Sequence, residues 1–382
     1  MKKKMIPAIM AMFLILCIFP ARVESAEIAI DCPCAVLMDM NTKRVLYEKD
    51  SHKKQPIASM TKIMTMLIAM EYLDEGRITP EDSVIISQRA SAMGGTRLFL
   101  EANEVRTVDD LLYGIAIESG NDAAVALAEF IGGSYEGFIE LMNEKARQLG
   151  MDDSYFGTPC GLEDKDNYSC AYDTALMSAE LLKHERIYNY ISVWTKEVTV
   201  GRNNDVKRVL ANTNKLLTQT DYVDGIKTGY TSQSGYCLSA TAKKGDMRLI
   251  AVVMNAQSSA VRFTDTKTLL IYGMNSFEGK YIIKPGDTVC AAPILNAENP
   301  TSELAVREGV YSLSEAGKQK QYEEKTEIFP SLSAPIDGNT PVGKLTITSN
   351  EEVFTLDLYP SAPIEKCTFR EFLRRIGEYA LY

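Results

Sequence analysis

Three short strings follow one another along this 382-residue chain, and each carries a hydroxyl group, an amide or a cation. They are Ser59-Met60-Thr61-Lys62, Ser119-Gly120-Asn121 and Lys227-Thr228-Gly229. A serine hydroxyl becomes a good nucleophile at neutral pH only when a base takes its proton. The chain contains only two histidines, His52 and His184, so a lysine is the more economical base. The strings therefore predict a fold that gathers three distant segments around an active serine.

The sequence around Ser59 distinguishes it from a second copy of the same pattern. Ser51-His52-Lys53-Lys54 also reads S-x-x-K, but it lies in a polar, charged run. Ser59 instead opens the apolar stretch of residues 60–73, which predicts a buried helix that starts just after Pro56. A serine at a helix start lies at the positive end of the dipole, and a lysine three residues later returns to its side.

The other two strings fall at predicted element ends. A capping pair, Thr107 and Asp110, begins a helix that ends near Ser119, and a second helix begins near Asp122. The S-G-N string thus lies in the joint between two helices, and K-T-G lies at the end of a strand, where a backbone can pair with an extended peptide. The other predicted elements are a hairpin over 35–48, helices over 138–149, 175–182 and 262–274, and strands over 223–229, 236–242 and 247–256.

In these three motifs the chain resembles the serine penicillin-binding proteins and β-lactamases. It is most similar to the low-molecular-mass D-alanyl-D-alanine carboxypeptidases, over about residues 30–365. The strings that carry this resemblance are PIASMTK from Pro56, TVDDLLYGIAIESGNDAAVALAE from Thr107, DGIKTGYT from Asp224 and MRLIAVVMNA from Met247. The resemblance implies an α+β fold, with a transpeptidase-like domain in which helices flank an antiparallel sheet.

The expected reaction is acyl transfer through Ser59, with Lys62 as the base. Ser59 attacks the carbonyl group of a terminal D-Ala-D-Ala peptide, and water later releases the acyl group. Lys62 must be neutral for this role, which burial and the nearby positive charge of Lys227 would favour. By resemblance, Ser119 passes a proton to the leaving amine, and Asn121 positions Lys62 or the substrate backbone.

The remaining predicted site residues bind substrate. Lys227 and Thr228 suit a substrate carboxylate, and Gly229 leaves the strand open to the substrate. The backbone N–H groups of Ser59 and Tyr230 are the expected oxyanion donors. Arg262 falls where related enzymes carry an arginine at the carboxylate end of the site, although a surface salt bridge is an equal alternative. No metal and no cofactor are expected.

The domain boundaries predicted from the sequence are a signal peptide (1–26), a catalytic domain (27–276), a β-rich domain (277–365) and an amphipathic C-terminal helix (366–382). Lys2, Lys3 and Lys4 precede an apolar run and small residues at Ser25 and Ala26, as in a secretory leader, with an uncleaved anchor as the alternative. Residues 281–358 combine short strand patterns with turn signals, which predicts a small β-sandwich. The protein is expected outside the cytoplasmic membrane.

Charge and cysteine content limit the partners. The net charge of −10 argues against nucleic acid and leaves peptidoglycan stem peptides, with β-lactams as covalent inhibitors. Seven cysteines follow the leader without zinc spacing. Cys160 and Cys170 bracket a polar loop and could form a disulfide in an oxidising compartment, or all seven could be free thiols.

The C-terminal segment places four apolar side chains on one helical face: Phe369, Phe372, Leu373 and Ile376. Such a helix could lie in a membrane interface, and related carboxypeptidases often end in one. The alternative is a helix packed on the β-rich domain.

Three rival functions share the motifs. A class A β-lactamase needs a glutamate that activates the deacylating water, and Glu163 with Asn167 has a suitable spacing. An endopeptidase or transpeptidase would use the same acyl-enzyme. A catalytically silent, penicillin-sensing wall-binding protein is the third, although every expected catalytic residue is present.

Overall fold

The computed structural model describes residues 28–162, 166–350 and 352–380. The predicted leader and Glu163 lie outside the described residues. None of the described helices combines the length and the apolar character that crossing a bilayer requires.

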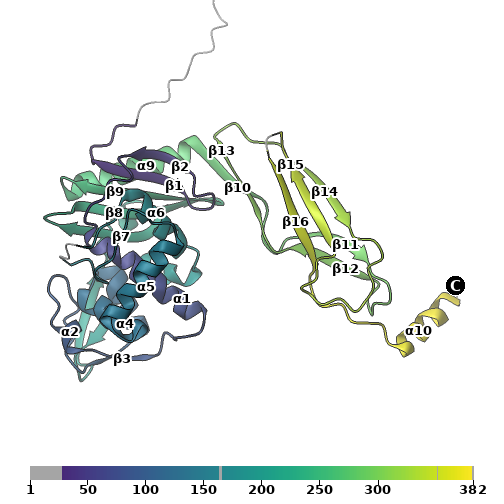
Figure 1. The fold of residues 1–382 in the computed structure, drawn as a ribbon, viewed down its shortest axis with the longest axis horizontal. Coiled ribbons are helices and arrows are strands. Elements are labelled where there is room, and N and C mark those ends of the chain that lie inside the picture. Colours follow the sequence, from purple (N-terminus) through teal and green to yellow (C-terminus); the bar gives the residue numbers. More distant parts are fainter. Residues whose placement is uncertain (1–27, 163–165, 351, 381–382) are drawn as a thin grey trace, which may run out of the picture. The chain divides into compact units, whose positions relative to one another are not determined.

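A five-stranded antiparallel sheet forms the scaffold of the first domain, with strand order β2-β1-β9-β8-β7 (Figure 1). Its strands are β1 (Cys34–Asp39), β2 (Val45–Lys49), β7 (Val223–Thr231), β8 (Gly235–Lys244) and β9 (Met247–Ala256). Strand β7, which carries K-T-G, lies at the edge of this sheet, because β8 is its single neighbour in the strand order. The outer side of the K-T-G backbone is therefore not used by the sheet itself.

Alternating side chains on the central strands bury both faces of the sheet. On one face, helix α9 (Ser259–Ser276) packs so closely that a Cβ atom built on Gly273 would lie 2.9 Å from a Leu37 methyl. On the other face, Val36 and Val252 join the main hydrophobic core, which also includes residues of helix α6 (Ala171–Leu181). The central strands therefore consist almost entirely of apolar residues, as expected for a sheet covered on both sides.

The helical part of this domain is built around helix α1, which starts immediately after the 3-10 turn η1. In chain order, its helical elements other than α6 and α9 are η1 (Ala58–Thr61), α1 (Lys62–Asp74), α2 (Gln88–Ser91), α3 (Val108–Tyr113), the π-helical turn η2 (Gly114–Glu118), α4 (Asn121–Gly132), α5 (Tyr135–Gln148), η3 (Glu185–Ile187), α7 (Tyr188–Ile191) and α8 (Leu216–Gln219). Two small hairpins complete it: β3 (Ser83–Ile85) with β4 (Val105–Thr107), and β5 (Thr195–Val200) with β6 (Val206–Ala211).

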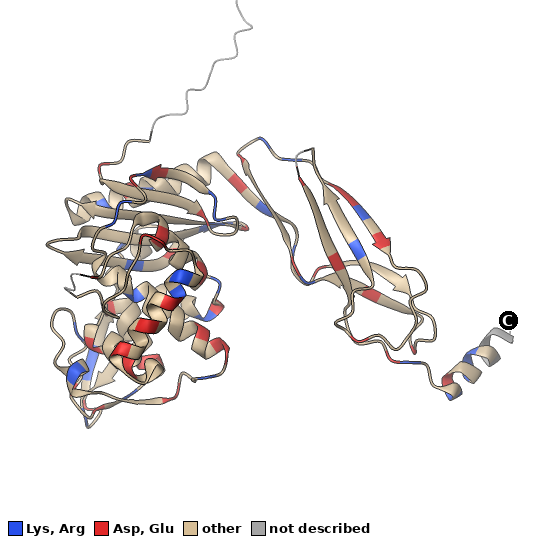
Figure 2. Cartoon of the chain, in the orientation of Figure 1, with Lys and Arg blue, Asp and Glu red and all other residues tan. Residues whose placement is uncertain are grey.

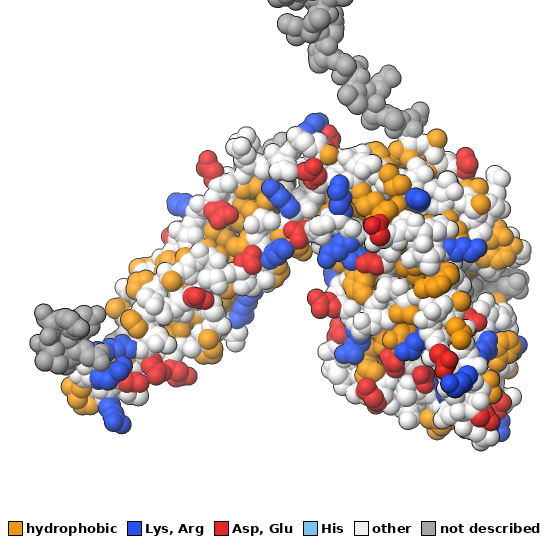
Figure 3. Space-filling view, turned by 180° about the vertical axis from the view of Figure 1, so that it is seen from behind, with side chains coloured by type: hydrophobic (Ala, Val, Ile, Leu, Met, Phe, Trp, Pro, Cys, Tyr) orange, Lys and Arg blue, Asp and Glu red, His pale blue; other side chains and the backbone are white. Residues whose placement is uncertain are grey.

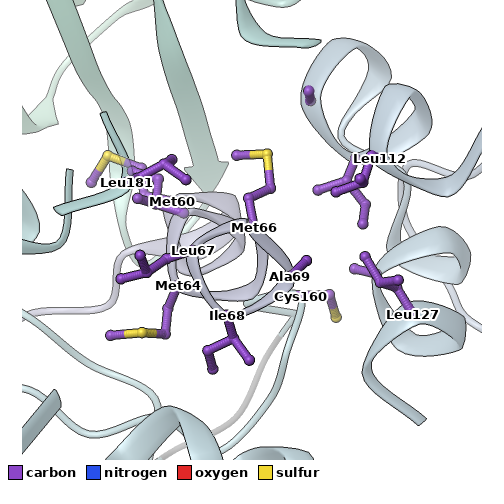
Figure 4. Packing of buried hydrophobic residues seen from close by; sticks show 14 of the residues in the cluster. Met60, Met64, Met66, Leu67, Ile68, Ala69, Leu112, Leu127, Cys160 and Leu181 are labelled. Carbon is purple, nitrogen blue, oxygen red and sulfur yellow. The ribbon is translucent and has the colours of Figure 1, made fainter. Parts of the chain in front are cut away.

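Helix α1 is buried on every side. Figure 4 shows Met64, Met66 and Ile68 pointing away from its axis in different directions, with Leu112 and Leu127 of neighbouring helices packed nearby. A helix that is apolar all round can be stable only in the interior of a domain. The apolar stretch that follows Ser59 in the sequence is therefore the central helix of the core, and it fixes the position of the turn before it.

Most of the predicted elements of this domain are confirmed. The 35–48 hairpin, the helices from Thr107 to Gly132 and the three strands after residue 222 all form. Thr107 caps α3 as predicted, because its Oγ1 accepts the N–H of Asp110 at 3.1 Å. The sequence analysis did not predict the 83–107 and 195–211 hairpins.

The chain after residue 276 is β-rich, as predicted. Strands β10 (Phe277–Ile283) and β13 (Val310–Glu315) pair with each other, and a five-stranded sheet has the order β11-β12-β16-β15-β14. Its strands are β11 (Thr288–Pro293), β12 (Thr301–Val306), β14 (Glu323–Ile328), β15 (Gly343–Thr348) and β16 (Val353–Pro360). Leu304, Leu345 and Leu358 are fully buried in a core of their own.

The described cysteines are free thiols, so Cys160 and Cys170 form no disulfide in this structure. The Cys170 sulfur instead accepts the N–H of Asp173 at 3.3 Å and caps the start of α6. Both side chains are fully buried.

Candidate active site

Ser59 lies in the 3-10 turn η1 (Ala58–Thr61), directly before the buried helix α1. We call Ile57–Thr61 the nucleophile turn. Ala58 has a positive φ of 48°, which turns the chain sharply before the helix. Ser59 is partly exposed between the buried residues Ala58 and Met60. The prediction that Ser59 lies at a helix start is confirmed, with a 3-10 turn as the first turn. The serine is thus held rigidly and can still be reached from outside.

The Lys62 amine lies next to Ser59 and contacts three oxygen atoms. Its Nζ is 3.0 Å from Ser59 Oγ, 2.7 Å from Asn121 Oδ1 and 2.7 Å from the Cys160 carbonyl oxygen. A neutral amine has two N–H bonds and one lone pair. The two shorter contacts need the N–H bonds, since an amide oxygen and a carbonyl oxygen only accept. The lone pair then points at the Ser59 hydroxyl, as a general base requires.

Burial makes the neutral form of Lys62 accessible. The side chain is fully buried, and this desolvation lowers the pKa of Lys62 to about 8. The nearby Cys160 and Asp122 act in the opposite direction. The predicted neutralisation by burial therefore has the right sign, and a substantial fraction of the amine is free base slightly above neutral pH.

The S-G-N joint supplies the residue that holds Lys62. Asn121 donates its side-chain N–H to the Gly94 carbonyl oxygen at 2.8 Å, while its Oδ1 binds Lys62. The structure thus places the Asn121 amide on the lysine. Ser119 has a left-handed φ of 67° and ends the π-helical turn η2, so the chain changes direction between η2 and α4. Among the described residues, Ser119 shares no hydrogen bond with Ser59 or Lys62.

The K-T-G strand brings a second buried cation to the site. Lys227 is 1% exposed, and its Nζ donates to the Thr228 carbonyl oxygen at 3.2 Å. Desolvation, with repulsion from Lys62 and Arg262, holds the pKa of Lys227 well below its usual value. A buried amine with so little hydrogen bonding within the described protein is a suitable partner for an anion. Thr228 donates its hydroxyl to Thr213 Oγ1 at 2.7 Å.

Gly229 lies in close contact with the nucleophile turn. A Cβ atom built on Gly229 would lie 2.7 Å from the Ile57 carbonyl oxygen and 3.3 Å from the Met60 backbone nitrogen. The missing side chain therefore makes room for the nucleophile turn, which packs directly on β7. This close contact fixes the position of Ser59 relative to Lys227. The approach of a substrate along the strand at Gly229 stays a prediction.

Tyr230 belongs to strand β7, and the Arg262 side chain contacts this strand from helix α9. Arg262 extends from α9, and its Nη1 lies 3.2 Å from the carbonyl oxygens of Gly229 and Cys237, which face each other across β7 and β8. The guanidinium group is buried and holds the K-T-G strand to its neighbour. The Tyr230 side chain is 55% exposed, and its ring centroid lies 4.3 Å from that of Tyr236.

Neither histidine is in this cluster. His52 pairs with Asp153 at 3.1 Å, and His184 contacts Asp74 at 2.5 Å. Ser51 of the second S-x-x-K string donates its hydroxyl to Glu48 at 2.9 Å. Lys62, and not a histidine, lies within hydrogen-bond distance of Ser59.

Three contributors to the site were missed by sequence reasoning. The carbonyl oxygens of Cys160 and Gly94 act through the backbone, so no side-chain motif identifies them. Thr213 follows the unpredicted 195–211 hairpin, and its N–H donates to the Ile117 carbonyl oxygen at 3.3 Å. The alternation in Thr195–Val200 and the turn residues after it could have identified this hairpin.

A serine at a buried helix start, a desolvated lysine base and an edge strand with a second buried lysine define an active-serine acyl-transfer enzyme. Comparison with known proteins gives the family. A family model described as D-alanyl-D-alanine carboxypeptidase matches residues 21–258, and one described as penicillin-binding protein 5, C-terminal domain, matches residues 277–366. The chain belongs to the D-alanyl-D-alanine carboxypeptidase family and is a serine-type peptidase.

Individual relatives match nearly the whole chain. D-alanyl-D-alanine carboxypeptidase DacF of Bacillus subtilis is 39% identical over 94% of this chain and 92% of its own length. DacA of Escherichia coli is 32% identical over 92% of this chain and 87% of its own length. The crystal structure of penicillin-binding protein 5 from Haemophilus influenzae is similar with a TM-score of 0.67 and 31% identity, covering 88% of this chain and 98% of that one. The predicted α+β fold with a β-sandwich domain is confirmed.

The contact at Gly229 gives a first test. We expect Gly229→Ala to slow acylation of the protein by a fluorescent penicillin about 100-fold, because the new methyl group pushes the nucleophile turn off the strand. Gly338→Ala is the control, since its Cβ would meet nothing closer than Pro363 at 3.7 Å. Equal rates for Gly229→Ala and the unaltered protein would disprove this role of the glycine.

Proposed function

We propose that Ser59, Lys62 and Ser119 carry out the carboxypeptidase reaction on peptidoglycan stem peptides that end in D-Ala-D-Ala. The observation that carries this proposal is the Lys62 amine, which lies 3.0 Å from Ser59 Oγ with two other acceptors at 2.7 Å. Ser59 Oγ forms a bond to the penultimate carbonyl carbon while its proton moves to Lys62. The bond between this carbon and the amide nitrogen then breaks.

Proton transfer to the leaving group completes the first half of the reaction. The nitrogen of the departing D-alanine receives the proton from Lys62 by way of the Ser119 hydroxyl. In the second half, a water molecule loses a proton to Lys62 and its oxygen forms a bond to the ester carbon. The bond from this carbon to Ser59 Oγ then breaks, and Oγ takes the proton back from Lys62, which regenerates both side chains. The N–H groups of Ser59 and Tyr230 stabilise the oxyanion in both halves.

The remaining residues bind or position the substrate. Lys227 and Thr228 hold the terminal carboxylate of the substrate. The negative charge of this carboxylate stabilises the ammonium form of the buried Lys227, which burial alone disfavours. Asn121 holds Lys62, Gly229 admits the nucleophile turn, and Arg262 keeps the K-T-G strand in place. The outer edge of β7 gives an extended peptide a backbone to pair with.

The rival functions use the same first half-reaction. The β-lactamase alternative depends on Glu163, outside the described residues, while Asn167 is engaged with Thr61 at 2.9 Å and with the Gly157 N–H at 3.3 Å. D-alanyl-D-alanine endopeptidase of Escherichia coli is 30% identical over 62% of this chain. Cleavage of a cross-linked dimer in the experiment below would favour that activity.

We further propose the domain boundaries 1–26, 27–276, 277–365 and 366–382, with action outside the cytoplasmic membrane. Lys and Arg positions are interspersed with Asp and Glu positions along the ribbon (Figure 2), and the net charge of −10 disfavours nucleic acid as a partner. β-Lactams, which carry a strained amide and a carboxylate, would acylate Ser59 as substrate analogues.

The serine assignment is tested with a muropeptide that ends in D-Ala-D-Ala. We expect Ser59→Ala to reduce the release of free D-alanine at least about 1,000-fold, because it removes the hydroxyl that lies 3.0 Å from the Lys62 amine. Ser51→Ala removes the serine of the second S-x-x-K string, whose hydroxyl contacts Glu48 and not Lys62, and should retain the normal rate. Release that survives Ser59→Ala would refute the mechanism.

The lysine assignment predicts the pH dependence. Only neutral Lys62 can accept the proton, and its pKa of about 8 lies inside the accessible range. We therefore expect kcat/KM to rise about 50-fold between pH 6 and pH 8 and to level off above pH 9. The fluorescence of Trp194, the single tryptophan, checks that the fold is unchanged at each pH. A flat profile over this range would exclude Lys62 as the base.

We also propose that helix α10 (Phe369–Ala380) associates with a membrane surface. Phe369, Phe372, Leu373 and Ile376 are each at least half exposed, so the β-rich domain does not cover this apolar face. Hydrophobic and basic side chains lie together on the visible surface at this end of the chain (Figure 3). Arg375 donates to the Ala297 carbonyl oxygen at 3.1 Å, which ties the helix to the β-rich domain.

Sedimentation with phosphatidylglycerol vesicles tests the helix. We expect Phe372→Glu and deletion of residues 366–382 to lower the bound fraction severalfold, because each removes apolar surface from the interface. Val353→Glu places the same charge at a residue of the β-rich domain that is 67% exposed and should change little. Unchanged sedimentation after the deletion would rule out the anchor.

A further inference from the structure

An exposed aromatic ring between two guanidinium groups lies in the segment that leads to α3. Phe99 is 58% exposed, and the Arg97 and Arg208 Cζ atoms each lie 4.7 Å from its ring centroid. Its φ is +62°, in the left-handed region that bulky residues rarely adopt. Such conformations persist where the surrounding structure imposes them, and they cluster at functional sites. We call Arg97, Phe99 and Arg208 the arginine–phenylalanine platform.

The neighbours of Phe99 hold its backbone in this conformation. The N–H groups of Leu98 and Leu100 both donate to the buried Asp122 carboxylate at 3.0 Å, and Arg208 Nη1 donates to the Leu98 carbonyl oxygen at 2.7 Å. Leu98 and Leu100 are buried, whereas the residue between them faces outward. The fold therefore fixes a phenylalanine on the surface, where its ring contributes little to the hydrophobic core.

The platform adjoins the S-G-N joint of the active site. The Thr96 carbonyl oxygen accepts the Asn121 N–H at 2.8 Å, and Asn121 in turn holds Lys62. Arg208 Nη2 lies 3.7 Å from Glu118, the residue before Ser119. Arg97 directly follows Thr96, which bonds to the joint, and Arg208 contacts the residue before it. Two of the three platform residues therefore lie next to the S-G-N joint.

The charge of the platform is not balanced. Glu118 compensates Arg208, but within the described part of the chain Arg97 has no carboxylate partner, and its buried Nε has no hydrogen bond. The chain as a whole carries a net charge of −10, so an arginine that no carboxylate among the described residues balances is a local exception. A guanidinium group next to an exposed ring suits a ligand that combines an apolar stem with a carboxylate.

We propose that the arginine–phenylalanine platform is a subsite for a side-chain carboxylate that the substrate carries on the N-terminal side of its D-Ala-D-Ala terminus. The inference rests on the function proposed above. The leaving residue is the last of the substrate, and its own carboxylate belongs to Lys227 and Thr228. All other substrate groups therefore lie on the acyl side of the scissile bond. A carboxylate there needs a cation other than Lys227 as its partner. Arg97 binds the carboxylate, Phe99 packs on its stem and Arg208 positions the ring.

Two synthetic peptides test the subsite. Both end in Lys-D-Ala-D-Ala with acetylated amines, and they differ in a preceding γ-linked D-glutamyl residue or its uncharged isoglutaminyl amide. We expect the unaltered protein to favour the acidic peptide about tenfold in kcat/KM. Arg97→Gln and Phe99→Ala should bring this ratio close to 1. The preference should also fall as salt is raised from 50 to 500 mM, because it is electrostatic.

Arg89→Gln is the matched control. Its guanidinium Cζ lies 4.6 Å from the Tyr135 ring centroid and its Nη1 lies 3.0 Å from Glu136, so it is another surface arginine on an aromatic ring. This variant should keep the tenfold ratio. A ratio of 1 in the unaltered protein, or a ratio unaffected by Arg97→Gln, would overturn the subsite while leaving the carboxypeptidase function intact. Absence of D-alanine release from either peptide would overturn the function itself and the subsite with it.

Discussion

The contact on which the rest of the site depends is the one between the Lys62 amine and the Ser59 hydroxyl. Water would keep this amine protonated, so the fold has to remove water without leaving the nitrogen unsatisfied. Asn121 and the Cys160 carbonyl oxygen take its two N–H bonds. The protein thereby keeps a base of lowered pKa in place and leaves one direction open, toward Ser59.

This arrangement explains why the nucleophile turn is so tightly packed. Helix α1 is enclosed by apolar side chains, which fixes Lys62 at its first turn. Two glycines let other backbone segments approach the turn closely. Gly229 faces Ile57 and Met60, and Gly161 lies so close to Ala58 that a Cβ would be 1.9 Å from its carbonyl oxygen. Burial of the lysine and immobilisation of the serine therefore have the same structural cause.

Local signals in the sequence predicted much of the fold and the gathering of Ser59, Lys62 and Asn121 in one place. The apolar stretch after Ser59, the Thr107 cap and the three strands around K-T-G depend on neighbouring residues, and all were recovered. Contacts between residues that are far apart in the sequence were not predicted. The Cys160 carbonyl oxygen is supplied 98 residues from Lys62, and the Gly229 clearance concerns a turn at Ile57. Neither leaves a local pattern, since one is a backbone atom and the other an absent side chain.

The charges around the site link the two lysines. Burial, with repulsion from Lys62 and Arg262, lowers the pKa of Lys227, so the site disfavours two neighbouring ammonium groups. In the function proposed above, the terminal carboxylate of the substrate lies beside Lys227 and stabilises its ammonium form. This ion pair has no net charge. Lys62 would therefore keep the lowered pKa that its own burial gives it while the peptide is bound, and the site could hold a charged terminus without protonating the amine beside Ser59.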